Sequence, residues 1–187
     1  SETMYLPTVE AIEKASQILR RTPRSTPCQR NANLSDIYEA EVYLKREDLQ
    51  MVRSYKIRGA YNKIRTIDPA LVQNGIVCAS AGNHAQGVAF SCSKLKIMGS
   101  IFMPVTTPKQ KIEQVRMFGK EFIEIVLTGD TFDAANAAAI AFAEESGRTF
   151  IPPFDDPKVM EGQGTIGREI LNQTNVKLDY VFVPIGG

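Results

Sequence analysis

The chain alternates short apolar runs with longer stretches in which apolar residues recur every three or four positions. The short runs indicate buried strands, and the longer stretches indicate helices that bury one face. This pattern predicts strands at residues 39–44, 75–79, 100–103, 122–127, 149–151 and 180–184.

The helical stretches lie between these strands. Ser54 offers an N-cap for a helix that reaches about Asp68, and Gly147 closes an alanine-rich helix that begins near Thr131. Strands that alternate with helices predict the α/β class, with open parallel sheets covered by helices on both faces. Ligands bind at the carboxyl ends of the strands in such sheets, so the turns after strands are the candidate sites. Further helices are predicted at 82–95, 108–118 and 166–173.

The composition is that of a folded protein without a strong charge of either sign. Of the 187 residues, 43% are hydrophobic and 23% are charged, and the formal net charge is +1. We therefore expect a small-molecule ligand and no nucleic-acid or anionic-membrane partner. Cys28, Cys78 and Cys92 are widely spaced and His84 is the single histidine, so we expect no metal site and reduced, mostly buried thiols.

Two features favour the cytoplasm. Residues 1–10 lack the basic and apolar segments of a secretory signal. The longest weakly polar stretch, 134–143, is about half of the ~20 residues that a membrane span needs. We therefore expect a cytoplasmic protein without a membrane span.

Lys56 lies in the first turn of a predicted helix, within the sequence Arg-Ser-Tyr-Lys-Ile-Arg-Gly-Ala of residues 53–60. If this lysine is buried, the helix dipole and the nearby Arg53 and Arg58 disfavour its ammonium form. Such an amine is a good nucleophile toward a carbonyl group. For an isolated lysine, the ordinary alternative is a solvated place on a helix surface.

A second candidate segment, Ser-Ala-Gly-Asn-His-Ala-Gln-Gly at residues 80–87, joins a predicted strand to a helix. Small residues let a ligand approach the backbone, and free amides at a helix start bind a carboxylate or phosphate. Asn83 adds a side-chain amide that suits a polar ring substituent. The alternative is an ordinary capped turn, with His84 satisfied by a neighbour.

The third candidate segment is Val-Pro-Ile-Gly-Gly at residues 183–187, where a predicted strand runs into consecutive glycines. Glycines permit the backbone conformation that points several amides at a phosphate. A natural domain rarely ends at the carboxyl edge of a central strand. We therefore expect the chain to be truncated, the front part of a longer protein.

Together these segments resemble the serine/threonine dehydratase family of fold type II pyridoxal-phosphate enzymes. Residues 44–50 (Leu-Lys-Arg-Glu-Asp-Leu-Gln) and 162–165 (Gly-Gln-Gly-Thr) also match that family. The resemblance extends along nearly all of the chain and is strongest for the biosynthetic threonine dehydratases, which catalyse the first step of isoleucine synthesis. It implies two parallel-sheet lobes, with 54–149 as a small inserted lobe and with 1–53 and 150–187 as part of a larger cofactor-binding lobe.

The resemblance also implies a role for each candidate residue. Lys56 is the catalytic residue and forms the Schiff base with pyridoxal 5'-phosphate, while the aromatic Tyr55 lies against the cofactor ring. Asn83 contacts the ring hydroxyl, and Gly186 and Gly187 begin the phosphate loop. The substrate carboxylate is received by Ser80, Ala81, Gly82, Asn83 and His84.

The implied reaction is a β-elimination from threonine. The substrate amine displaces Lys56, and the freed lysine takes the Cα proton while the cofactor delocalises the negative charge. The β-hydroxyl leaves as water, and the released enamine tautomerises and is hydrolysed to 2-oxobutanoate and ammonia; serine gives pyruvate by the same route. Members of the family usually form homodimers or homotetramers.

Two rival interpretations stay open: a related pyridoxal-phosphate enzyme, such as a serine racemase or a threonine synthase, and an inactive fragment of such an enzyme. Serine racemases carry a second serine where this chain has Ala81. The methyl group of Ala81 cannot transfer a proton to the opposite face of Cα, so elimination is favoured over racemisation.

Residues 162–167 have the glycine spacing of a dinucleotide-binding fingerprint, Gly-Gln-Gly-Thr-Ile-Gly. The fingerprint requires a strand before it, and the preceding residues 155–161 do not form one. We therefore expect these glycines to let a helix pack closely instead of binding a nicotinamide cofactor.

Overall fold

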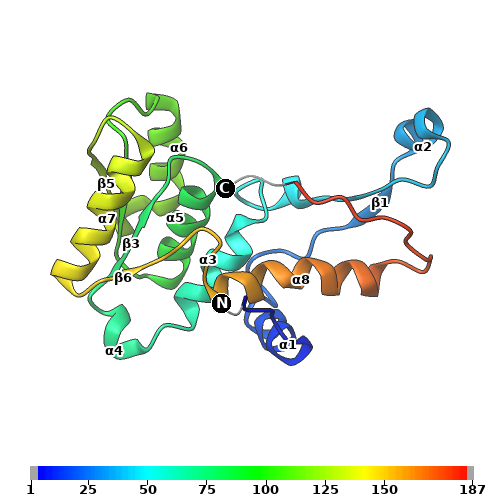
Figure 1. The fold of residues 1–187 in the computed structure, drawn as a ribbon, viewed down its shortest axis with the longest axis horizontal. Coiled ribbons are helices and arrows are strands. Elements are labelled where there is room, and N and C mark those ends of the chain that lie inside the picture. Colours follow the sequence, from blue (N-terminus) through cyan, green and yellow to red (C-terminus); the bar gives the residue numbers. More distant parts are fainter. Residues whose placement is uncertain (1–3, 185–187) are drawn as a thin grey trace.

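The computed structural model describes residues 4–184, which form a compact part and an extended arm (Figure 1). The compact part holds a sheet with helices around it. The arm extends in the same direction as helix α8 (Pro157–Gln173). It carries the short helix α2 (Ala32–Tyr38) at its end, far from the sheet. In chain order the elements are α1 (Val9–Ile18), β1 (Cys28–Arg30), α2 (Ala32–Tyr38), β2 (Tyr43–Lys45), the 3-10 helix η1 (Glu47–Leu49), α3 (Lys56–Arg65), α4 (Pro69–Val72), β3 (Ile76–Ala79), α5 (Asn83–Leu95), β4 (Gly99–Met103), α6 (Lys109–Gly119), the 3-10 helix η2 (Lys120–Phe122), β5 (Ile123–Leu127), α7 (Phe132–Ser146), β6 (Thr149–Phe150) and α8 (Pro157–Gln173).

Strands β5, β4, β3 and β6 form, in this order, a four-stranded parallel sheet. Alternate residues of a strand point to opposite faces of its sheet. On one face, Ile76 and Cys78 of β3 pack in a core with residues of α3, α5 and α6. On the other face, Val77 and Ala79 pack with residues of α7. The predicted parallel sheet with helices on both faces is therefore confirmed.

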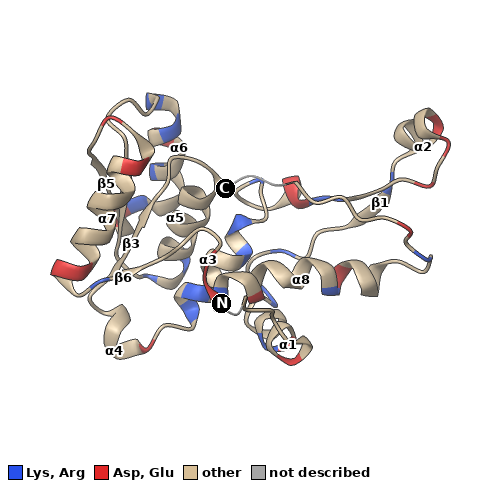
Figure 2. Ribbon diagram, in the orientation of Figure 1, with Lys and Arg blue, Asp and Glu red and all other residues tan. Residues whose placement is uncertain are grey.

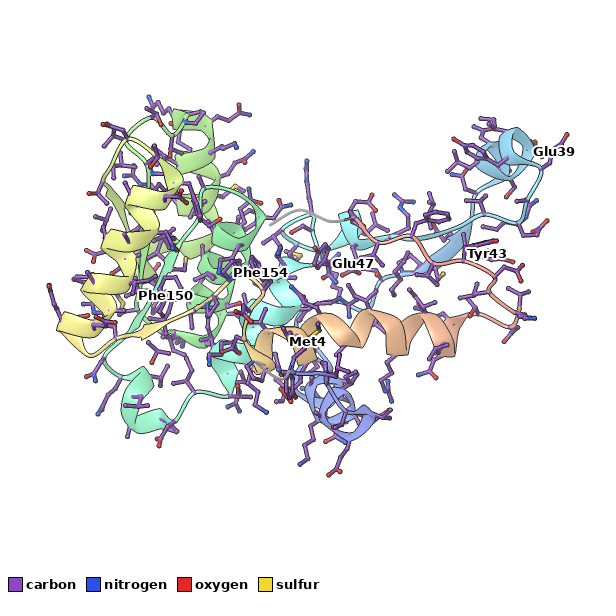
Figure 3. All side chains as sticks on the ribbon, viewed as in Figure 1. Met4, Glu39, Tyr43, Glu47, Phe150 and Phe154 are labelled. Atoms are coloured by element: carbon purple, nitrogen blue, oxygen red, sulfur yellow. The ribbon has the colours of Figure 1, made fainter. Side chains whose placement is uncertain are left out.

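The remaining strands, β1 and β2, pair in an antiparallel ribbon within the arm. This ribbon corrects the prediction of a strand at 39–44. Glu39 adopts the left-handed conformation that ends α2, with φ of 49°, and β2 begins only at Tyr43 (Figure 3). Apart from the parallel sheet, this ribbon is the only sheet among the described residues.

The prediction of a strand at 180–184 is wrong for the described residues. A strand needs a neighbour that accepts and donates its backbone hydrogen bonds, and no described strand lies beside this segment. Its apolar side chains are open to solvent, with exposed fractions of 81% for Tyr180 and 90% for Phe182.

Helix α8 begins nine residues earlier than the predicted start at residue 166, at Pro157. The Asp156 carboxylate accepts hydrogen bonds from the backbone amides of Lys158 and Val159, and Pro157 occupies the first turn. An aspartate followed by a proline is a helix-start signal in its own right. None of the described helices is both long enough and apolar enough to span a membrane.

Helix α3 is packed closely between α5 and α8, and glycines make this possible. A Cβ placed on Gly87 of α5 would lie 3.0 Å from the backbone N and Cα atoms of Ile57. A Cβ placed on Gly162 of α8 would lie 2.5 Å from the carbonyl oxygen of Arg58 and 2.8 Å from the Cα of Gly59. The glycine at 162 therefore serves helix packing, as the sequence indicated.

We expect Gly162→Ala to destabilise the fold, because the added methyl group meets backbone atoms that cannot rotate away. Overpacking of this kind costs about 1–3 kcal/mol. The matched control is Gly167→Ala on the same helix, where a Cβ would meet no atom within 4 Å; gain of helix propensity makes it neutral or stabilising by up to about 1 kcal/mol. Urea unfolding measures both free energies, and equal stability of the two variants would contradict this packing.

Candidate active site

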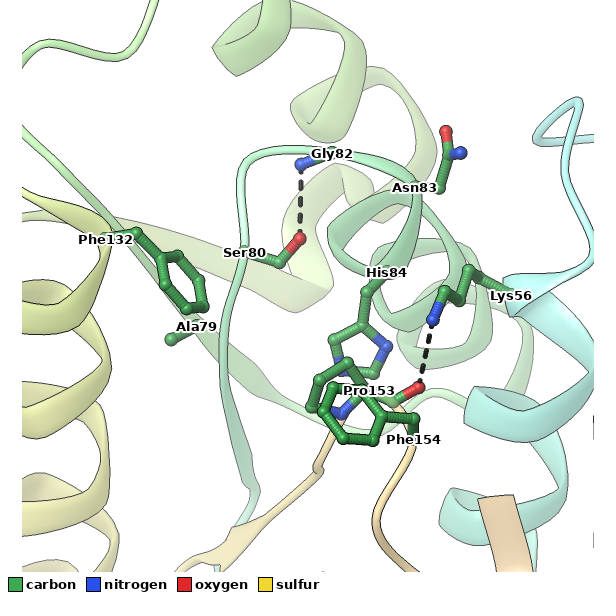
Figure 4. Close-up of a pocket in the computed structure, with 9 residues that line it drawn as sticks. All are labelled: Lys56, Ala79, Ser80, Gly82, Asn83, His84, Phe132, Pro153 and Phe154. Carbon is green, nitrogen blue, oxygen red and sulfur yellow. Dashed lines mark hydrogen bonds between the residues drawn. The ribbon is translucent and has the colours of Figure 1, made fainter. Parts of the chain in front are cut away.

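A pocket of about 310 Å³ lies where β3 and β6 end, at the carboxyl edge of the parallel sheet (Figure 4). This is the edge at which open α/β sheets bind ligands, and the volume is at the lower limit for small-molecule sites. The lining residues come from the start of α3, the end of β3 and the turn after it, the starts of α5 and α7, and the segment after β6. They are Lys56, Ala79, Ser80, Gly82, Asn83, His84, Phe132, Pro153 and Phe154.

Lys56 is the first residue of α3 and is 7% exposed. Its side chain points into the pocket, where Nζ donates a hydrogen bond to the Pro153 carbonyl oxygen at 3.3 Å. Nζ also lies 5.6 Å from the ring centre of Tyr55 and 5.9 Å from that of Phe154. Burial lowers the pKa of Lys56, so the amine is easier to deprotonate than a solvated lysine.

The expectation that the charges of Arg53 and Arg58 lower the pKa of Lys56 is wrong. Burial is the cause that lowers the pKa. The Arg58 guanidinium bonds to carboxylates on the other side of the helix, so its charge is compensated. Arg53 is exposed to solvent, where water screens its charge.

The turn after β3 is held by the Ser80 hydroxyl, which accepts hydrogen bonds from the amides of Gly82 at 3.1 Å and Ala85 at 3.2 Å. A Cβ placed on Gly82 would meet no atom within 4 Å, so the missing side chain leaves this side of the pocket open. Asn83 begins α5 and lies on the same side of the pocket as Lys56 in Figure 4. Ala81 packs against the apolar core and does not line the pocket.

His84 is buried beneath the turn, with Nε2 3.0 Å from the carbonyl oxygen of Ile151. Burial lowers its pKa to about 4, the bond to Ile151 opposes this shift, and the charge of Lys56 adds to it. The imidazole is therefore neutral at pH 7. Because a carbonyl oxygen only accepts, Nε2 carries the proton and donates it to Ile151.

The structure brings five of the nine predicted site residues to the pocket: Lys56, Ser80, Gly82, Asn83 and His84. Tyr55 is near Lys56 without lining the pocket, and Gly186 and Gly187 lie outside the described residues.

Sequence analysis missed four lining residues: Ala79, Phe132, Pro153 and Phe154. Pro153 and Phe154 follow β6 directly, so the rule that parallel sheets bind ligands after their strands could have found them. Phe132 is the first residue of α7, directly after the N-cap Thr131. Nothing in the sequence around it indicates a binding site.

None of the three cysteines lines the pocket. Cys78 and Cys92 are buried, Cys28 is partly buried, and all three are free thiols, as expected. In the part of the chain that the structure describes, no three His, Cys, Asp or Glu side chains gather as metal ligands would.

Comparison with known proteins agrees with this geometry. The biosynthetic L-threonine dehydratases of Bacillus subtilis (strain 168) and Halalkalibacterium halodurans are 56% and 54% identical to this chain over 179 residues. In both cases the match covers 96% of this chain and only 42% and 43% of the relative. The chain therefore spans less than half the length of these relatives.

Solved structures of related enzymes share the fold. Processed threonine deaminase isoform 2 from Solanum lycopersicum has a TM-score of 0.81 at 41% identity, over 91% of this chain and 48% of that one. Maize serine racemase has a TM-score of 0.84 at 28% identity, over 90% of this chain and 50% of that one. Residues 19–187 match the family described as pyridoxal-phosphate dependent enzyme. With its parallel sheet, its lysine at the carboxyl edge and these relatives, the chain belongs to the pyridoxal-phosphate dependent enzymes of fold type II.

Proposed function

We propose that this protein eliminates water from threonine, and from serine, and that hydrolysis of the released enamine gives ammonia and 2-oxobutanoate or pyruvate, as the first step of isoleucine biosynthesis. The observation that carries the proposal is the buried amine of Lys56, which points into a pocket faced by the turn at 80–84. The relatives named above as biosynthetic threonine dehydratases support it.

The residues of the pocket fit pyridoxal phosphate. The cofactor has an aldehyde for an amine, a flat ring with a hydroxyl group, and a phosphate. Lys56 offers a desolvated amine, Phe154 offers an aromatic face beside it, and Asn83 offers an amide that donates and accepts. The open space at Gly82 leaves room for a ring.

Each residue then has a defined task. Bound pyridoxal phosphate supplies a ring that stabilises negative charge at the Cα of an attached amino acid. Lys56 would hold the cofactor aldehyde, and its free Nζ would accept the Cα proton of the substrate. Tyr55 would contact the ring, Asn83 would bond to the ring hydroxyl, and Gly186 and Gly187 would contribute to binding the phosphate.

The turn at 80–84 receives the substrate carboxylate. The backbone amides of Asn83 and His84 lie in the first turn of α5, where a helix leaves its amides unpaired and its dipole favours an anion. The Ser80 hydroxyl holds the turn in shape by accepting from two other amides. Neutral His84 ties the turn to Ile151 and is not a proton donor at pH 7.

The two-lobe division belongs to the same proposal. We assign residues 54–149 to a small lobe, because the parallel sheet and helices α3 to α7 fall almost wholly within this range. Residues 1–53 and 150–187 form part of a larger lobe that includes α1, α8 and the antiparallel ribbon. We further propose a cytoplasmic homodimer or homotetramer, the form usual in the family.

Racemisation of serine is the rival activity, favoured by the similarity to maize serine racemase. Racemisation needs a proton donor on the face of Cα opposite Lys56. Ala81 stands where serine racemases have a second serine, and its methyl group carries no exchangeable proton. With L-serine we therefore expect pyruvate to exceed D-serine, and a chiral separation of the products decides between the two activities.

Borohydride reduction of the full-length protein, loaded with pyridoxal phosphate, is expected to fix the cofactor on Lys56. The matched control residue is Lys109, which is also the first residue of a helix but has an 89% exposed side chain. Lys56→Ala should lose the label and reduce 2-oxobutanoate formation by at least about 10³-fold, as loss of a covalent catalyst does. Lys109→Ala should keep both the label and the activity. Peptide mapping and a ketoacid assay are the measurements, and a label on another residue would overturn the assignment.

Burial of His84 predicts a stability loss on acidification. The unfolded state takes up a proton near pH 6.5 and the folded state only near pH 4, so stability is complete above pH 6.5 and falls as the pH drops toward 4. The shift corresponds to about 3 kcal/mol. In urea unfolding, His84→Gln should lack this part of the pH slope, and identical slopes in the two proteins would contradict a neutral buried histidine.

A further inference from the structure

A buried ion cluster lies against the side of α3 that faces away from the pocket. Its centre is Arg58, which is 1% exposed and bonds to the carboxylates of Glu47 and Glu169. Residues 56 and 58 are two helix positions apart, which is about 200° around the axis. Lys56 and Arg58 therefore leave the helix on nearly opposite sides.

Every N–H group of the Arg58 guanidinium is used. Nε and Nη2 donate to Glu47 at 2.6 and 2.9 Å, and Nη1 and Nη2 donate to Glu169 at 2.5 and 2.9 Å. The remaining N–H of Nη1 donates to the hydroxyl of Thr165 at 2.9 Å. Five donors are needed to meet both oxygens of two carboxylates and a hydroxyl at once, and the guanidinium of arginine has five where lysine has three.

The two carboxylates are fixed in their turn. Glu169 accepts from Lys45 Nζ at 2.8 Å, and Glu47 accepts from the hydroxyl of Thr26 and from Gln50. Two cations and two anions thus balance in a partly buried cluster, in which loss of one partner would leave a charge uncompensated. The cluster connects α3 to η1 and to α8, and Glu47 lies beside α3 in Figure 3.

Each of the three residues after Lys56 contacts another helix. The Ile57 backbone lies against Gly87, and the Gly59 amide donates to the Gln163 side chain at 3.0 Å. This bond matters because the N-cap residue, Tyr55, provides no side-chain acceptor for the first amides of α3. Arg58 is the one residue of this turn that ties it to both η1 and α8.

We propose that Arg58 is a positioning residue for Lys56: its bonds to Glu47 and Glu169 set the first turn of α3, and thereby the place of the lysine amine in the pocket. This inference rests on the proposed function of Lys56. It predicts that a weaker clamp moves the amine while the protein stays folded. A displacement of about 1 Å at a reacting group costs on the order of a hundredfold in rate.

The test is Arg58→Lys in the full-length protein, which keeps the charge balance but cannot make both forked contacts. A matched control is Val115→Ala, a core cavity on α6 away from the cluster. Both proteins are compared at a temperature where circular dichroism shows them folded. The first readout needs no cofactor: the rate at which trinitrobenzenesulfonate labels Lys56, with exposed Lys109 as internal reference, followed by peptide mapping.

We expect Arg58→Lys to change the rate at which trinitrobenzenesulfonate labels Lys56 at least about fivefold. The rate at which pyridoxal phosphate reacts with Lys56, measured after borohydride reduction, should fall at least about tenfold. Val115→Ala should leave both within twofold of the wild type. A Lys56 that reacts equally in Arg58→Lys and wild type, or one that Val115→Ala perturbs as strongly, would overturn the proposal. If pyridoxal phosphate labels no lysine in the wild type while trinitrobenzenesulfonate still distinguishes the variants, the proposed function fails and the positioning role stands.

Discussion

The close packing of helix α3 between α5 and α8 is the constraint on which the rest of the structure depends. Two glycines, Gly87 and Gly162, let the three helices approach to backbone contact. Helix α5 joins α3 to the sheet, while α8 and η1 join it to the arm. Close packing of the helix supports the lysine at its start, as a reacting group requires.

Desolvation acts on both basic groups of the pocket in the same direction. Burial lowers the pKa of Lys56 and that of His84, so the pocket favours uncharged nitrogen atoms. The histidine becomes a fixed neutral tether. The lysine gives up its proton more readily than a solvated lysine does, which suits a residue that alternates between nucleophile and base.

Local signals made most of the compact part predictable. The apolar runs at 75–79, 100–103 and 122–127 became β3, β4 and β5, and β3 and β4 are buried at every residue, as continuous apolar runs predict. Lys56 and the turn at 80–84 were found because helix starts and strand ends are visible in sequence. The arm was not predicted well: β2 has only three residues, and residues 180–184 have a strand-like pattern although no described strand pairs with them.

The pocket walls and the ion cluster illustrate what one sequence hides. Phe132 and Phe154 are distant in sequence and meet the pocket only through the order of the strands. Arg58 looked like a charge that would repel a proton from Lys56, and only the folded chain shows the carboxylates that compensate it. Pairings of this kind depend on tertiary contacts, which hydrophobic periodicity does not encode.

The ion cluster also bears on the order in which the elements fold during synthesis on the ribosome. Its bonds from Arg58 to Thr165 and Glu169 join residues 107 and 111 positions apart, whereas the strands of the sheet follow one another at short intervals. Synthesis proceeds from the N-terminus, and early parts fold as they emerge. The sheet can thus assemble before Glu169 has been synthesised. Helix α3 forms its bonds to Thr165 and Glu169 only after α8 has left the exit tunnel.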